Sequence, residues 1–167
     1  MSEKIKILDS KAVSQKLKRL AWEVYEKNLN EKEIFIVGVS NRGLRIAKKL
    51  SKHIEEISTI DTTVSSLELD KDNPYKKDIE MSVAVDNYKN KVVILCDDVL
   101  NSGKTLMYAS KHFLIQPLTK LSIVVLVERS HNCYPIKADY VGLSLATTLQ
   151  EYVNVILGGS DQGVYLS

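Results

Sequence analysis

The sequence predicts an α/β fold in which a parallel sheet is covered by helices on both faces. Three short segments rich in apolar and β-branched residues lie at positions 34–39, 92–96 and 121–127, and each has the composition of a buried strand. Amphipathic segments of helical length alternate with these strands along the chain. This alternation is typical of parallel strands joined by crossover helices, which cover both faces of the sheet.

Three helices are expected from apolar residues that recur at helical spacing. Asp9 or Ser10 can cap the first helix, and the second follows the strand at residues 34–39. The third runs from about Lys104 to Ile115. The inward-facing residues are Val13, Leu17, Leu20 and Val24 in the first helix and Leu44, Ala47, Leu50, Ile54 and Ile57 in the second.

The segment between the second helix and the strand at residues 92–96 divides into two parts. Residues 59–69 are rich in β-branched residues, and apolar and polar residues alternate enough along them to predict a further strand. Residues 70–80 are charged, contain Pro74 and lack an apolar period, which predicts a mobile loop.

Composition favours a soluble, cytoplasmic protein. A chain of 167 residues is expected to form a single domain over residues 1–167, and 44% hydrophobic with 26% charged residues is typical of globular proteins. The net charge of +2 is too small to indicate nucleic-acid binding by itself. No apolar run approaches the length of a membrane span, and Cys96 and Cys133 lack metal-type spacing.

The most informative segment combines two acids with a turn of small polar residues. Asp97 and Asp98 follow the strand at residues 92–96, and the turn at residues 101–105 opens the third helix. Carboxylates accept hydrogen bonds from vicinal hydroxyls, whereas the backbone N–H groups of such a turn bind an anion. The spacing therefore predicts a site for a ribose 5-phosphate.

Two other readings of this segment are less favoured. Residues 103–105 are the end of a nucleotide-triphosphate loop, but the first glycine of that motif would fall at Asp98, where a carboxylate would face the triphosphate. The acids could also be a solvated helix cap, a reading that the complete ordered set makes improbable.

Residues 97–105 resemble the phosphoribosyl-pyrophosphate motif of the type I phosphoribosyltransferases, and residues 37–43 resemble their pyrophosphate loop. Residues 126–131 and 135–142 are similar to the branch of bacterial pyrimidine operon regulators with uracil phosphoribosyltransferase activity, as is the opening at residues 7–9. The resemblance implies a Rossmann-like, type I phosphoribosyltransferase fold with a flexible hood loop, and an oligomer that is a dimer or larger.

The resemblance also implies a reaction, a metal and a set of site residues. A nucleobase displaces pyrophosphate from phosphoribosyl pyrophosphate, with Mg²⁺ bound to the sugar diphosphate. Asp97, Asp98 and Arg42 are the expected catalytic residues. The expected phosphoribosyl-pyrophosphate contacts are Ser40, Asn41, Arg42, Gly43, Asp97, Asp98, Val99, Leu100, Asn101, Ser102, Gly103, Lys104 and Thr105, with Lys104 included for its backbone N–H.

The charged segment at residues 70–80 corresponds to the hood of this family, which folds over the bound diphosphate. Related hoods usually carry an arginine and a tyrosine, whereas this one has no arginine, and its candidate residues are Lys71, Tyr75, Lys76 and Lys77. Lysine cannot form the two-pronged contact of arginine with a diphosphate. Low turnover, and a merely solvated loop, are both alternatives.

Three departures from the purine branch favour uracil as the acceptor base. That branch usually has an aspartate in place of Asn101, a lysine in place of Glu128 and an aromatic residue near Leu149. A purine acceptor (hypoxanthine or guanine) remains the alternative within the family. The candidate base contacts are Glu128, Arg129, Thr147 and Glu151.

Two other kinds of function remain open at this stage. One is a regulator that binds messenger RNA and senses uridine nucleotides, for which Arg19, His131 and Lys137 are candidate contacts. Trp22 and Asn132 replace a histidine and an arginine expected in such regulators, which weakens this prediction. The other is a module that binds the sugar phosphate without turnover.

Overall fold

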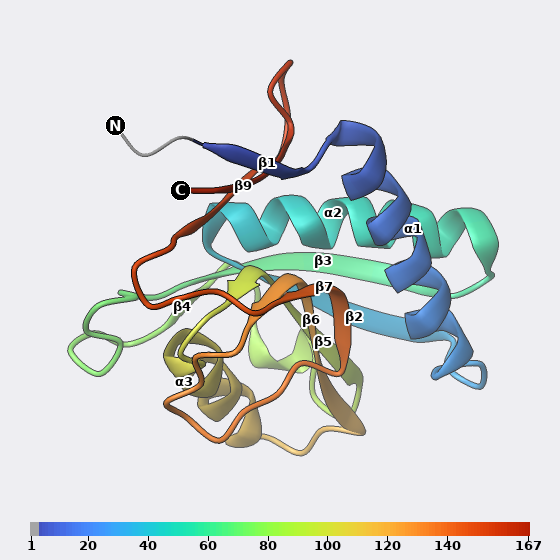
Figure 1. Cartoon of the computed structure of the whole chain (residues 1–167). Helices are drawn as coiled ribbons and strands as arrows, with labels where there is room; N and C mark the ends of the chain where they lie inside the picture. Colours follow the sequence, from blue (N-terminus) through green and yellow to red (C-terminus); the bar gives the residue numbers. More distant parts are fainter. Residues whose placement is uncertain (1–3) are drawn as a thin grey trace.

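The computed structural model describes residues 4–167 (Figure 1). The helices are α1 (Ser10–Glu26), α2 (Ser40–Ile57), α3 (Lys104–Leu114) and the short 3₁₀ helix η1 (Val85–Asn87). The strands are β1 (Ile5–Leu8), β2 (Glu33–Val39), β3 (Asp61–Glu68), β4 (Glu80–Met81), β5 (Val92–Leu100), β6 (Lys120–Arg129), β7 (Tyr140–Leu145), β8 (Val153–Ile156) and β9 (Gly163–Leu166). None of the helices in this range is long and apolar enough to traverse a bilayer.

The main sheet has the order β4-β3-β2-β5-β6-β7, and all neighbouring pairs except β3 and β4 are parallel. The predicted parallel sheet is therefore confirmed. From β2 the chain continues to β3 on one side, and it later returns to place β5 on the other side. Ligands of such sheets bind at the carboxyl ends of the strands beside this reversal point, which here lies between β2 and β5.

Helices cover both faces of the sheet, as predicted (Figure 1). Asp9 caps α1 by accepting a hydrogen bond from the backbone N–H of Ala12 at 2.8 Å. The predicted inward residues of α1 are buried against α2 and one face of the sheet. On the other face, α3 buries Phe113 against Tyr88, which is fully buried with its ring centroid 5.0 Å from that of Phe113.

A second, three-stranded antiparallel sheet with the order β1-β9-β8 lies on the α1 and α2 side of the molecule (Figure 1). It was not predicted, because its strands have only four residues each and pair residues from opposite ends of the chain, such as Ile5 with Leu166. Val155 and Val164 bury their side chains in the same core as α1 and α2.

Several element boundaries differ from the prediction. The strand predicted at residues 92–96 continues to Leu100, so both acids belong to β5 rather than to the turn that follows it. α2 begins at Ser40, whose φ of 56° is in the left-handed region that a non-glycine residue rarely adopts. The predicted loop at residues 70–80 ends in β4, which pairs with β3.

Candidate active site

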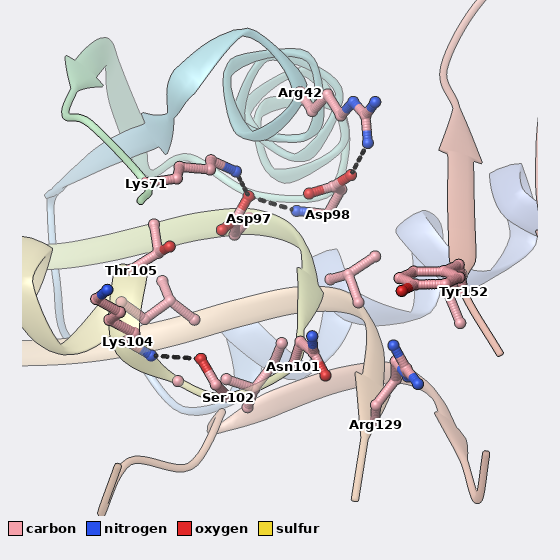
Figure 2. A pocket seen from close by; sticks show the side chains of 15 residues that line it. Arg42, Lys71, Asp97, Asp98, Asn101, Ser102, Lys104, Thr105, Arg129 and Tyr152 are labelled. Carbon is pink, nitrogen blue, oxygen red and sulfur yellow. Dashed lines mark hydrogen bonds and ion pairs between the residues drawn. The ribbon is translucent and has the colours of Figure 1, made fainter. Parts of the chain in front are cut away.

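A polar cavity of about 270 Å³ lies at the carboxyl ends of β5 and β6, beside the start of α2 (Figure 2). Side chains from α2, the predicted hood, β5, the following turn and the C-terminal segment line it. The lining residues are Arg42, Lys71, Asp97, Asp98, Val99, Leu100, Asn101, Ser102, Gly103, Lys104, Thr105, Leu106, Arg129, Tyr152 and Val153. The predicted acid pair and the predicted anion-binding turn therefore share one cavity.

Asp97 and Asp98 are nearly buried, with exposed fractions of 2% and 4%. Each carboxylate has a cation beside it (Figure 2): Lys71 Nζ lies 3.6 Å from Asp97 Oδ1, and Arg42 Nη1 lies 3.3 Å from Asp98 Oδ2. The backbone N–H of Asp98 also donates to Asp97 Oδ1 at 2.9 Å. One cation thus lies beside each acid at this end of β5.

Burial raises the pKa of Asp97 to about 8, because removing the carboxylate from water disfavours its charged form. The Lys71 ammonium opposes this effect, and the adjacent Asp98 carboxyl adds to it. Even with Lys71 beside it, Asp97 is therefore largely protonated at neutral pH in the free protein.

This raised pKa predicts how stability depends on pH. Above its ordinary pKa of 3.8, the unfolded Asp97 has released a proton that the folded protein keeps up to about pH 8. The folded state should therefore lose stability as pH rises from about 5 to about 8, by up to about 1.4 kcal/mol per pH unit from this group. The free energy of unfolding, measured with urea across this pH range, should fall less for Asp97→Asn than for wild type as pH rises. Parallel curves would contradict the assignment.

The turn after β5 is held in shape by the loop at residues 131–136. The carbonyl of Ser102 accepts hydrogen bonds from the backbone N–H groups of Cys133 and Tyr134, at 2.8 and 3.1 Å. Gly103 has a φ of 84°, in the left-handed region that favours glycine, and immediately precedes α3. The turn therefore presents the N-terminus of α3, with its partial positive charge, to the cavity.

The start of α2 brings Arg42 to the acids. A Cβ atom on Gly43 would lie 2.3 Å from the carbonyl oxygen of Cys96, so only glycine allows α2 to approach β5 this closely. Ser40, Asn41 and Gly43 were predicted contacts, but none of the three lines the cavity. Of that predicted loop, Arg42 alone reaches it with its side chain.

Arg129 is the only predicted base contact that lines the cavity. Arg129 is 5% exposed, and its guanidinium donates through Nε to Thr147 Oγ1 and through Nη2 to the carbonyls of Thr148 and Glu151. Thr147 and Glu151 therefore position Arg129 instead of lining the cavity. Glu128 also lies outside the lining, where its carboxylate accepts a hydrogen bond from the Ser144 hydroxyl across β6 and β7.

Only one predicted hood residue, Lys71, reaches the cavity. Tyr75 and Lys77 line a separate hollow against α3, and Lys76 is exposed. The side chain of Lys104, predicted to matter only through its N–H, donates from Nζ to the carbonyl of Asp72 in the hood at 2.7 Å.

Tyr152 and Val153 line the cavity but were not predicted. Figure 2 shows the ring of Tyr152 near Arg129. The aromatic residue of the purine branch is expected near Leu149, three positions earlier than Tyr152. An aromatic ring in the C-terminal segment was the available signal, but its position beside the cavity follows from the pairing of β8 with β9.

The fold and this cavity define a class of protein. A family model described as phosphoribosyl transferase domain matches residues 5–156, and the chain belongs to this family. Proteins named bifunctional protein PyrR are similar over nearly the whole chain. The one from Clostridium acetobutylicum is 37% identical over 97% of this chain and 95% of its own length, and the one from Bacillus subtilis is 32% identical over 97% and 94%. The predicted family and branch are confirmed.

Solved structures with the same fold include purine enzymes. A hypoxanthine-guanine phosphoribosyltransferase from Bacillus anthracis gives a TM-score of 0.72 at 24% identity, covering 84% of this chain and 82% of its own. A hypoxanthine phosphoribosyltransferase from Trypanosoma cruzi gives 0.79 at 12% identity, covering 96% and 94%. At these identities the likeness concerns the fold alone, and it confirms the predicted fold class.

Proposed function

We propose that the protein transfers the phosphoribosyl group of phosphoribosyl pyrophosphate to a nucleobase, with uracil as the leading acceptor. The observation that carries the proposal is the shared cavity, in which the Asp97 and Asp98 carboxylates and the turn at residues 102–105 face one volume of about 270 Å³. A single ribose 5-phosphate can reach both. Its 2- and 3-hydroxyls donate to the carboxylates, and its phosphate accepts from the backbone N–H groups of the turn.

Mg²⁺ fits this site as part of the substrate. Asp97 and Asp98 supply carboxylate oxygens, the ligand type that Mg²⁺ prefers. Within residues 4–167 no three His, Cys, Asp or Glu side chains are grouped so as to hold a metal ion. The remaining ligands are therefore expected from the sugar diphosphate and water, and the bound ion would neutralise charge on the diphosphate.

The protein's own residues would stabilise charge on the departing diphosphate and hold the ribose in position. In the transition state the sugar gains positive charge and the departing diphosphate gains negative charge, which calls for fixed cations at the diphosphate. Arg42, at the start of α2, and Lys71, in the hood, are the cations nearest the acid pair. The buried carboxylates hold the ribose in line, and the hood limits the access of water.

The base would lie at the end of the cavity formed by Arg129 and Tyr152. Uracil is favoured because Asn101 cannot exchange a proton with a purine ring, and because the relatives from Clostridium acetobutylicum and Bacillus subtilis are named bifunctional protein PyrR. A purine acceptor is the second candidate, since Tyr152 supplies an aromatic ring that can stack on a larger base.

Regulation through RNA binding has weaker support. The guanidinium of Arg19, one of its three predicted contacts, donates to the carbonyls of Val141 and Gly142 and pairs with Glu23 at 3.0 Å. This arginine thus fastens α1 to β7. Phosphate contacts would make RNA affinity fall steeply with salt. Undetectable binding to a pyrimidine-operon leader at low salt would remove this candidate.

One experiment tests the proposed function directly. The protein is mixed with Mg²⁺, phosphoribosyl pyrophosphate and, separately, uracil, hypoxanthine, guanine or orotate, and pyrophosphate release is followed. We expect the fastest release with uracil. Faster release with hypoxanthine or guanine would favour the purine candidate. Release with none of the bases, despite Mg²⁺-dependent thermal stabilisation by the sugar diphosphate, would favour a binding module without turnover.

A further inference from the structure

The lysine beside Asp97 comes from the hood, which links the hood to the acid pair. Lys71 Nζ lies 3.6 Å from Asp97 Oδ1, although the Lys71 side chain is 44% exposed and Asp97 is almost fully buried. A buried carboxylate is costly without a positive charge nearby. In this conformation Lys71 supplies that charge.

The backbone of the hood is shaped to present this lysine. Asp70 Oδ1 accepts hydrogen bonds from the backbone N–H groups of Asp72 and Asn73, both at 3.0 Å, which closes a tight turn around Lys71. Lys104 Nζ, from the first residue of α3, donates to the carbonyl of Asp72 at 2.7 Å. The hood is therefore fastened at two points, to β5 through Lys71 and to the N-terminus of α3 through Lys104.

A divalent cation at Asp97 and the ammonium of Lys71 would compete for the same carboxylate. Like charges that share one anion repel each other, and each weakens the binding of the other. A diphosphate offers Lys71 a new anionic partner close by, since Arg42 and Lys71 approach the acid pair together (Figure 2).

We propose that Lys71 is a movable partner of Asp97: it lies against this acid before the substrate binds and transfers to the diphosphate when Mg²⁺ arrives at the carboxylates. Lys104 keeps the hood over the cavity during this exchange by holding the carbonyl of Asp72. Lys71 is then a positioning residue for the diphosphate that also weakens the binding of metal alone, so metal and sugar diphosphate bind better together than separately. This inference rests on the proposed function.

The test uses two ligands for which the exchange predicts opposite effects of Lys71→Met. The first is Mn²⁺ alone, whose binding is followed by the electron paramagnetic resonance signal of the free ion at about pH 8.5. The variant should bind Mn²⁺ about threefold more tightly or better, because the competing charge is gone. The second is phosphoribosyl pyrophosphate with Mg²⁺, measured by calorimetry. Its affinity should fall about tenfold, the loss of one charge-assisted hydrogen bond.

Lys89→Met is the matched control, because it removes the same charge from an exposed position just before β5, at the opposite end of that strand from Asp97. It should change neither affinity. Weaker binding of both ligands by Lys71→Met, or unchanged Mn²⁺ binding, would overturn the exchange even if wild type turns over. If wild type does not bind the sugar diphosphate, the proposed function and the transfer of Lys71 to the diphosphate are both overturned. In that case, tighter Mn²⁺ binding by Lys71→Met would still support the pairing of Lys71 with Asp97.

The second fastening point is tested by hydrogen exchange. Lys104→Met should accelerate amide exchange in residues 70–79 several-fold, whereas Lys104→Arg, which retains a donor, should restore most of the protection. Equal exchange in all three proteins would contradict the role of Lys104.

Discussion

Asp98→Asn should lower the affinity for phosphoribosyl pyrophosphate on the order of 100-fold, which corresponds to the loss of one or two hydrogen bonds to a charged group. The amide keeps the shape of the side chain but removes the negative charge, which strengthens the hydrogen bonds from the ribose hydroxyls and attracts the Mg²⁺ bound to the substrate. Stability should change little, because the ion pair of Asp98 with the largely exposed Arg42 contributes only about 0–1 kcal/mol. Calorimetry and urea unfolding measure the two effects separately.

Asp61→Asn is the control for this variant, since Asp61 is exposed at the start of β3, at the opposite edge of the sheet. It should leave both affinity and stability unchanged. If Asp98→Asn instead unfolds at a much lower urea concentration than wild type, Asp98 serves the core, and its assignment to the ligand is wrong.

Gly103→Ala should have the largest effect on stability, about 2–5 kcal/mol, from two sources. The left-handed backbone at φ 84° costs a residue with a Cβ atom about 1–2 kcal/mol. The added Cβ would also lie 2.5 Å from Cγ2 of Ile136, so the Ile136 side chain or the loop that carries it must move, at a cost of about 1–3 kcal/mol. We also expect weaker binding of ribose 5-phosphate, because the strain acts on the turn that would hold its phosphate.

Gly159→Ala separates these two sources. Gly159 also has a left-handed backbone, with a φ of 76°, but no atom lies within 4 Å of the position of its added Cβ. Gly159→Ala should therefore be destabilised only by the backbone cost of about 1–2 kcal/mol, and should bind ribose 5-phosphate as wild type does. Equal destabilisation by the two variants, measured by urea unfolding, would show that the contact with Ile136 is unimportant.

The elements with strong local patterns were predictable from sequence, and the rest were not. β2, α1, α3 and the parallel order follow from apolar periodicity and from the Asp9 cap. The small sheet was missed because its pairing joins the two ends of the chain, which no local pattern records. The first residue expected to face inward from α2 was Leu44, but the helix begins four residues earlier, at Ser40. The left-handed backbone of Ser40 at this boundary could not be predicted from the sequence.

The site shows the same division. The acid pair and the turn at residues 101–105 are adjacent in sequence, so their common cavity could be anticipated. The contacts made by Lys71, Lys104 and Tyr152 depend on where the hood and the C-terminal strands come to rest, and sequence spacing contains no information on either. Thr147 and Glu151 were placed in the correct region, but they hold Arg129 and do not face the cavity.

One sugar phosphate should span the acid pair and the turn before α3. This binding mode can be seen in a crystal structure of the protein with ribose 5-phosphate. We expect the 2- and 3-hydroxyls within hydrogen-bond distance of the Asp97 and Asp98 carboxylates, and the phosphate on the backbone N–H groups of residues 102–105. A phosphate bound at the acid pair through Arg42 and Lys71, with the sugar directed away from the turn, would contradict it.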